Sequence, residues 1–175
     1  IPLRLVGSEM CIRDSLLLRH AKSSWKDSEL PDHDRPLKPR GIKAARRIGR
    51  LLFEQNLIPE RILCSTATRA RETLRLAEEE FPQKSATEFI AAFYHCAPRE
   101  FVTALHNVED NVHSVMIVGH NPGMEEWLQS LIGQPEVMPT GCLVQMALPV
   151  DNWSQVTEST RSELINIWRP RELMD

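Results

Sequence analysis

Apolar residues occur in short unbroken runs that alternate with segments of helical periodicity along most of the chain. Unbroken runs are typical of strands buried on both faces of a parallel sheet, and apolar residues spaced three and four apart are typical of amphipathic helices. The runs predict strands within residues 16–18, 61–64, 86–91, 115–118, 142–148 and 164–168. Helical spacing predicts helices over residues 41–55, 67–81, 98–108 and 122–132.

This alternation predicts a three-layer α/β/α sandwich with a mostly parallel central sheet. Residues 24–40 are rich in proline and charge and are expected to form a loop, and residues 169–175 a surface extension. Ser65 or Thr66 is expected to cap the second helix. Asn121 is expected to cap the fourth helix, with Pro122 as its first residue.

Composition restricts the kind of protein. The 175 residues are 42% hydrophobic and 26% charged, which is ordinary for a globular domain. The net charge of −3 gives no reason to expect a nucleic acid or an anionic membrane as partner. The four cysteines are widely spaced, so neither a zinc site nor a disulfide framework is indicated. We therefore expect a cytoplasmic monomer that carries no cofactor.

The first 14 residues do not continue the pattern of the domain. Their sequence resembles a translated cloning adapter fused to a reading frame, and such segments are kept out of fold reasoning. A signal peptide is the alternative, but the charges at Glu9, Arg13 and Asp14 interrupt the apolar region that it would need. We expect residues 1–14 to be non-native and residues 15–175 to form a single domain.

Residues able to bind an anion stand at the ends of predicted elements. Arg19 and His20 follow the first strand, and His120 follows the run that ends at residue 118. Arg69 falls in the first turn of a helix, where positive charge opposes the helix dipole, and this unfavourable placement favours a functional role. Ligands bind beyond the carboxyl ends of strands in open α/β sheets, and a guanidinium matches the geometry of a phosphate. The pattern predicts a phosphate site.

Other interpretations of these residues remain open at this point. The Arg-His pair is also common at the polar end of a strand, and Arg71 fits a surface cluster. His95 and His106 have no partner at metal-ligand spacing, so we expect them to be surface or structural residues. Metal catalysis on phosphate usually needs carboxylate ligands, which these strand ends lack. Attack of a histidine on phosphorus therefore fits better than metal catalysis.

Several motifs occur in order along the chain. They are LLLRHAKSSW at 16–25, DRPL at 34–37, CSxxxRARET at 64–73, VGHNPG at 118–123 and PTG at 139–141. With these motifs the sequence resembles the histidine phosphatase superfamily and, within it, the compact phosphohistidine phosphatases of the SixA type. The resemblance implies a phosphoglycerate mutase-like fold and runs from about residue 15 to the end of the chain.

The resemblance also implies roles for individual residues. His20 is expected to be the nucleophile that forms a transient phosphohistidine, which water then hydrolyses. Arg19 and Arg69 are expected to neutralise the phosphoryl oxygens, and His120 to donate to them in the transition state. Lys22 and Ser23 are expected to contact the substrate phosphate. No metal is required in this scheme.

The sequence departs from the superfamily pattern at three points. Ala21 replaces a glycine that often follows the first histidine, and Lys26 aligns with an asparagine that contacts phosphate. The mutase and acid-phosphatase branches carry an acidic proton donor between the second arginine and the second histidine. None can be assigned here, because Glu88 falls in a predicted strand and Glu100 in a predicted helix, and the compact branch is similar in lacking an obvious acid. A missing acid favours phosphohistidine, whose nitrogen leaves more readily than an alkoxide. The alternatives are a phosphomonoesterase for a small metabolite and a module that binds a phosphorylated ligand without turnover.

Overall fold

The computed structural model describes residues 12–173. Its strands are β1 (Arg13–Arg19), β2 (Arg61–Ser65), β3 (Ala86–Ile90), β4 (Ser114–Gly119), β5 (Leu143–Leu148) and β6 (Glu163–Trp168). Its α-helices are α1 (Pro39–Glu54), α2 (Thr68–Glu78), α3 (Pro98–His106), α4 (Gly123–Ile132) and the short α5 (Pro170–Leu173). The predicted strands and the four predicted helices are present, so the apolar patterns located the elements correctly.

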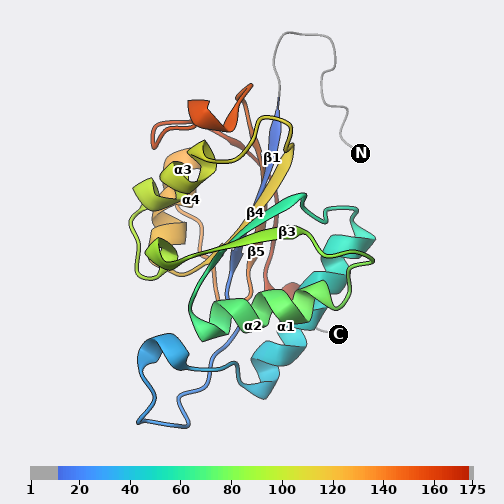
Figure 1. Cartoon of the computed structure of the whole chain (residues 1–175), viewed down its shortest axis with the longest axis vertical. Helices are drawn as coiled ribbons and strands as arrows, with labels where there is room; N and C mark the ends of the chain where they lie inside the picture. Colours follow the sequence, from blue (N-terminus) through green and yellow to red (C-terminus); the bar gives the residue numbers. More distant parts are fainter. Residues whose placement is uncertain (1–11, 174–175) are drawn as a thin grey trace.

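The strands form one mixed sheet in the order β3-β2-β4-β1-β5-β6. Neighbouring strands from β3 to β1 run parallel, and β5 pairs antiparallel with both β1 and β6. The prediction of a mostly parallel sheet is therefore confirmed. Because β1, β2 and β4 are parallel, their carboxyl ends lie at the same edge of the sheet. In Figure 1 this edge lies beside the loop that follows β1.

Helices cover both faces of the sheet (Figure 1). Leu17 of β1 packs in a core cluster with Phe101 of α3 and Trp127 of α4. The neighbouring Leu18 points to the other face and packs with Ile48 of α1 and Leu74 of α2. Successive side chains of a strand point to opposite faces, so an unbroken apolar run supplies both cores. The predicted three-layer α/β/α sandwich is confirmed.

Two predicted helix starts are wrong. The cap residue of helix α2 is Ala67, and Ser65 lies inside β2, where its hydroxyl contacts both Ala67 N–H and His120. Helix α4 begins at Gly123, and Pro122 rather than Asn121 is its cap residue. Each helix begins later than the local pattern predicts, and the Asn121 amide donates to Met138 O at 3.0 Å instead of capping α4.

The ends of the domain also differ from the prediction. Strand β1 begins at Arg13, so Arg13 and Asp14 belong to the sheet although the predicted non-native segment included them. Residues 1–11 lie outside the described residues, and the origin of that segment stays a prediction. The predicted surface extension after Trp168 contains the short helix α5.

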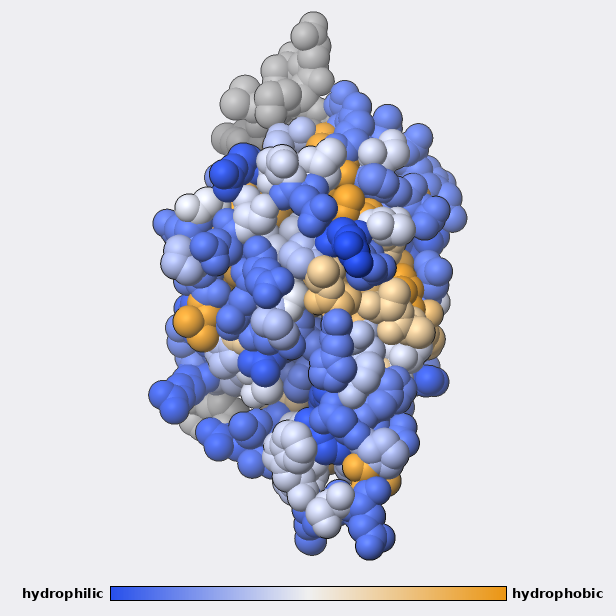
Figure 2. All heavy atoms as spheres, turned by 90° about the vertical axis from the view of Figure 1, so that its left-hand side faces the viewer, coloured by the Kyte–Doolittle hydropathy of each residue, from blue (hydrophilic) through white to orange (hydrophobic). Residues whose placement is uncertain are grey.

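The remaining fold features concern the surface and the thiols. No helix within residues 12–173 is long and apolar enough to cross a membrane. The face over α3 and α4 is mainly hydrophilic, with apolar residues in small groups (Figure 2). Cys64, Cys96 and Cys142 are free thiols, and Cys11 lies outside the described residues.

Candidate active site

Strand register places the two candidate histidines side by side. Arg19, the last residue of β1, pairs with Gly119, the last residue of β4. The next residues are therefore neighbours, and His20 N–H donates to Gly119 O at 3.1 Å. The imidazole centroids of His20 and His120 are 5.0 Å apart. The prediction from strand ends that these residues share one edge of the sheet is confirmed.

His20 is buried, and one of its ring nitrogens is already engaged. Nδ1 lies 2.8 Å from Ala21 O, which can only accept, so Nδ1 carries the proton. The lone pair is therefore on Nε2. Burial above all, together with the charges of Arg69 and Arg19, lowers the pKa of His20 to about 4, although the hydrogen bond to the Ala21 carbonyl acts in the opposite direction. The imidazole is neutral near pH 7 and able to act as a nucleophile.

His120 is also buried and neutral. Burial lowers its pKa to about 3, with further contributions from His20 and Arg69. Its Nε2 lies 2.8 Å from Ser65 Oγ, and that hydroxyl also accepts the N–H of Ala67 at 3.2 Å. A hydroxyl that accepts from Ala67 has its own proton free to donate to Nε2. That arrangement leaves the ring proton of His120 on Nδ1.

The two candidate arginines approach from different elements. Arg19 extends from the end of β1, and its Nη1 donates to Met138 O at 2.9 Å. Arg69 lies in the first turn of α2 and is buried, with Nη1 bonded to Asp32 O at 2.7 Å. The charges of both arginines oppose protonation of His20. The structure thus brings all four predicted residues to one place.

A second group of residues, which the sequence analysis missed, surrounds Arg69. Asp32 accepts from Arg69 Nη2 at 3.2 Å and from Arg35 Nε at 3.0 Å, and the Tyr94 hydroxyl donates to the same carboxylate. The Tyr94 hydrogen bond, followed by the two arginines, holds the pKa of Asp32 well below its usual range. The Tyr94 ring also packs edge-on against His120 with centroids 5.6 Å apart. Asp32 therefore stays a carboxylate that fixes the arginines.

Signals for some of these residues were present in the sequence. Arg35 is part of the DRPL motif, and Ser65 is part of the CSxxxRARET motif. Asp32 and Tyr94 had no such signal, because they contact Arg69 and each other only through the folding of a long loop and of the segment after β3.

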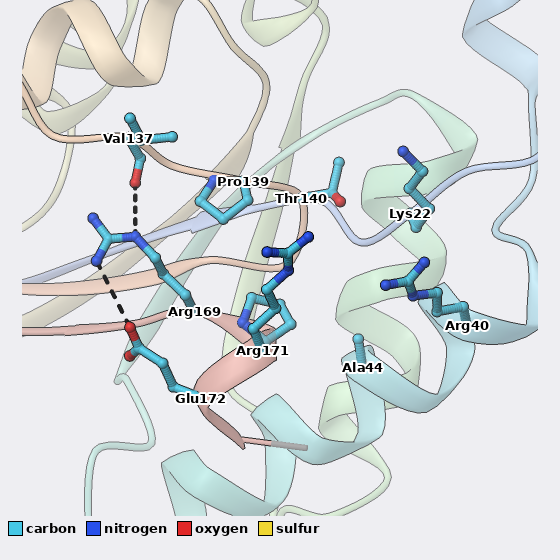
Figure 3. A pocket seen from close by; sticks show the side chains of 10 residues that line it. Lys22, Arg40, Ala44, Val137, Pro139, Thr140, Arg169, Arg171 and Glu172 are labelled. Carbon is cyan, nitrogen blue, oxygen red and sulfur yellow. Dashed lines mark hydrogen bonds and ion pairs between the residues drawn. The ribbon is translucent and has the colours of Figure 1, made fainter.

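Lys22 and Ser23 follow His20 closely along the chain, but their side chains face other groups. The Ser23 hydroxyl is buried and accepts from Arg35 Nη1 at 2.7 Å. Lys22 is exposed and lines a separate cavity that also involves Arg40 and Thr140 (Figure 3). Their predicted contact with the substrate phosphate stays a prediction.

Three buried nitrogen atoms at this site have no hydrogen-bond partner among residues 12–173. They are Arg19 Nε, Arg69 Nε and His120 Nδ1. Buried polar atoms in proteins are rarely left unpaired, and an unpaired one suggests a missing ligand. The two arginine nitrogens are donors, and His120 Nδ1 is a donor when Ser65 donates to Nε2. A ligand with several acceptor oxygens, such as a phosphoryl group, would satisfy them.

Metal ligands are not grouped in the described part of the chain. Across residues 12–173, no three His, Cys, Asp or Glu side chains are arranged so that they could hold a metal ion. The described residues instead group two histidines and two arginines at the carboxyl edge of an α/β sheet, and guanidinium groups in such a place match the geometry of an oxyanion.

Comparisons with known proteins indicate the family to which the chain belongs. The family model of the histidine phosphatase superfamily (branch 1) matches residues 15–89. An uncharacterized chloroplastic protein of Arabidopsis thaliana is 37% identical over 147 residues, which cover 75% of this chain and 67% of that protein. The chain spans about two thirds of the length of the curated relatives that it matches.

Solved structures extend the likeness to nearly the whole domain. A SixA chain from Agrobacterium tumefaciens, whose assignment as a phosphohistidine phosphatase is itself provisional, is 30% identical with a TM-score of 0.78. That match covers 90% of this chain and 98% of the other. The protein histidine phosphatase SixA complexed with tungstate is 21% identical, with a TM-score of 0.77. That match covers 91% of this chain and 99% of the other, and at this identity it supports only the similarity of the two folds.

The chain belongs to the histidine phosphatase superfamily. Within it, the fold is the phosphoglycerate mutase-like fold of the SixA proteins, which confirms the resemblance seen in the sequence motifs.

Proposed function

We propose that the protein is a phosphatase that removes the phosphoryl group from phosphohistidine in proteins, with His20 as the nucleophile. The observation that carries the proposal is the state of His20: a buried, neutral imidazole whose Nδ1–H is held by Ala21 O, so that Nε2 is the reactive atom. The superfamily and the A. tumefaciens SixA likeness support the phosphatase class.

The surrounding residues suit the two steps of such a reaction. In the first step a bond forms between His20 Nε2 and phosphorus while the phosphorus–nitrogen bond of the substrate breaks. Arg19, Arg69 and His120 would donate to the phosphoryl oxygens through nitrogens that have no hydrogen-bond partner among residues 12–173. In the second step water attacks the phosphohistidine, which releases inorganic phosphate and restores His20. Preorganised donors of this kind each lower the barrier by about 3 kcal/mol.

The nature of the leaving group favours a phosphoramidate. The carboxylate at the site, Asp32, has its pKa held well below its usual range and is a poor proton donor. Glu88 is exposed on β3, and Glu100 lies in the first turn of α3 beside Arg99. An alkoxide leaves poorly without a proton, whereas the nitrogen of phosphohistidine leaves more readily. The proposed substrate is therefore phosphohistidine rather than a sugar phosphate.

Metal independence and a cytoplasmic location are parts of the same proposal. Arg19 and Arg69 supply positive charge to the phosphoryl oxygens, and His20 supplies the nucleophile. Turnover is expected to survive exhaustive chelation. Loss of activity on chelation that magnesium or manganese restores would contradict this part of the proposal.

The decisive experiment is trapping of the covalent intermediate. Rapid quenching with a phosphohistidine peptide labelled on phosphorus should leave an acid-labile, base-stable label on His20. His20→Ala should abolish turnover, and His120→Ala should lower kcat by roughly 10²–10³. His113→Ala is the matched control, because His113 precedes β4 at the opposite edge of the sheet and should keep normal turnover.

Other outcomes would identify a different function. A label on a serine or on His120, or near-normal rates in His20→Ala, would refute the nucleophile. Faster hydrolysis of sugar phosphates than of phosphohistidine would support the small-metabolite phosphomonoesterase. Binding of orthovanadate without turnover of either substrate would support a binding module.

A further inference from the structure

A cavity of about 500 Å³ lies beside the phosphoryl site but does not include its histidines. It is bounded by the exit from β1, the first turns of α1, the loop before β5 and helix α5 (Figure 3). Its lining residues are Lys22, Arg40, Ala44, Val137, Pro139, Thr140, Arg169, Pro170, Arg171 and Glu172. The volume is in the range of sites that bind small molecules.

Positive charge around this cavity is not compensated. Arg169 is paired with Glu136 at 3.0 Å and lies 3.9 Å from Glu172. The side chains of Lys22, Arg40 and Arg171 form no hydrogen bond or ion pair with another residue of the described range 12–173. Figure 3 shows these three side chains extending from different elements toward the same space beside Thr140. Unpaired cations around a hollow favour an anionic ligand.

The walls are held in place by backbone contacts. Lys38 N–H donates to Lys22 O at 3.1 Å, and a Cβ atom on Gly41 would lie 2.1 Å from that same oxygen. The first turn of α1 therefore rests directly on Lys22. On the other side, Gly141 adopts a φ of 78°, and its N–H donates to His20 O at 2.9 Å. A Cβ atom there would lie 3.0 Å from Pro170 Cγ, so α5 packs closely on this loop.

These contacts also fix the cavity relative to the nucleophile. Lys22 follows His20 by two residues, so their Cα atoms are at most about 7 Å apart. Arg19 donates to Met138 O, within the segment that supplies Val137 and Pro139 to the cavity. One substrate molecule can therefore reach both places at once.

We propose that this cavity binds a second anionic group of the substrate, the carboxylate of an acidic residue near the phosphohistidine. The inference rests on the proposed phosphatase function. Val137, Pro139 and Pro170 supply apolar wall beside the cations, and Val137 is 67% exposed. An acidic side chain has the matching form, a carboxylate at the end of a short hydrocarbon stem. A second phosphate group on a small molecule would also carry negative charge, and the test below distinguishes such a phosphate from a carboxylate.

The first arm of the test compares two phosphohistidine peptides that differ only in having Asp or Asn beside the phosphohistidine. Wild-type protein should prefer the Asp peptide by about tenfold in kcat/KM, as expected for a few exposed ion pairs. Arg40→Ala combined with Arg171→Ala should reduce the preference to near one. Lys43→Ala is the control, because Lys43 is an exposed cation on α1 that does not line the cavity. The control should keep the preference.

The second arm does not depend on turnover. With orthovanadate added to fill the phosphoryl site, citrate is titrated by calorimetry as a carboxylate probe and glycerol 1,3-bisphosphate as a phosphate probe. Citrate should bind to wild type and to Lys43→Ala, and at least several-fold more weakly to the Arg40→Ala/Arg171→Ala variant. Added sodium chloride should weaken binding, because exposed charges are screened.

The outcomes separate this inference from the proposed function. Equal rates for the two peptides, or citrate binding that the double variant does not change, overturn the inference. If neither peptide is hydrolysed, the proposed function fails, and loss of citrate binding in the double variant still supports the anion site. If the bisphosphate binds and citrate does not, the result contradicts the proposal that the cavity binds a carboxylate. It would indicate a small phosphorylated ligand instead.

Discussion

Replacing His20 with alanine should flatten the dependence of folding stability on pH between 7 and 5. His20 is buried, and burial lowers its pKa to about 4. In the unfolded chain the same imidazole returns to its ordinary pKa of about 6.5. At pH values between these two pKa values, the imidazole is protonated in the unfolded state and neutral in the folded state.

The sign and size of the change in folding stability with pH follow from this difference in pKa. Stability rises with pH wherever the unfolded state binds more protons, so the contribution of His20 is fully present above pH 6.5 and is lost as pH falls toward 4. Between pH 7 and pH 5 the loss for one such histidine is about 2 kcal/mol. His120, whose pKa is lowered to about 3, adds a loss of the same sign that remains in the variant.

The assay is urea unfolding at pH 7 and at pH 5 at constant ionic strength. Each variant is compared with itself, so the direct effect of the substitution on stability cancels. Wild type should lose about 2 kcal/mol more than His20→Ala over this interval. Phe53→Ala is the control, because it removes an exposed side chain that carries no titratable group. If His20→Ala and wild type lose the same stability, His20 is not held neutral and the nucleophile assignment loses its basis.

Three further substitutions test the supports of the fold and the site. Arg13→Ala removes a buried side chain that donates to two main-chain carbonyls, and it should lower the free energy of unfolding by about 2 kcal/mol in urea. Ser65→Ala should lower kcat by about tenfold with little change in KM, and the loss should be smaller than in His120→Ala. Asp32→Asn weakens the anchoring of Arg69 and should raise the Kd for orthovanadate several-fold, whereas an unchanged Kd would show that the arginine is held by other contacts.

The sequence located the sheet well because its strands are buried. The runs around Leu17, Leu63 and Ile117 are apolar on both faces of the sheet, so each gives a strong local signal. The edge strand β3 is more exposed, so its pattern is less uniformly apolar than that of the buried strands. Helix starts were less predictable, because the Ser65 hydroxyl contacts His120, 55 positions away, as well as the local N–H of Ala67.

The candidate site was predictable where side chains follow strands. His20 and His120 come together because β1 and β4 pair in register, and that follows once the sheet is parallel. Asp32 could not be placed in the same way. It lies in a loop without periodicity, and its partners Arg69 and Tyr94 are 37 and 62 residues away.

The alanine that follows His20 shows how the site accommodates its departure from the superfamily pattern. The methyl group of Ala21 is fully buried against Leu37, Ala45 and Leu76, so the side chain fills a small space between β1 and the helices α1 and α2. Its N–H donates to Thr73 Oγ1 at 3.0 Å, and its carbonyl accepts from His20 Nδ1. Both backbone groups make these bonds whether residue 21 is glycine or alanine. A larger residue at this position would have to displace the helices, and through the Ala21 carbonyl it would also move the imidazole.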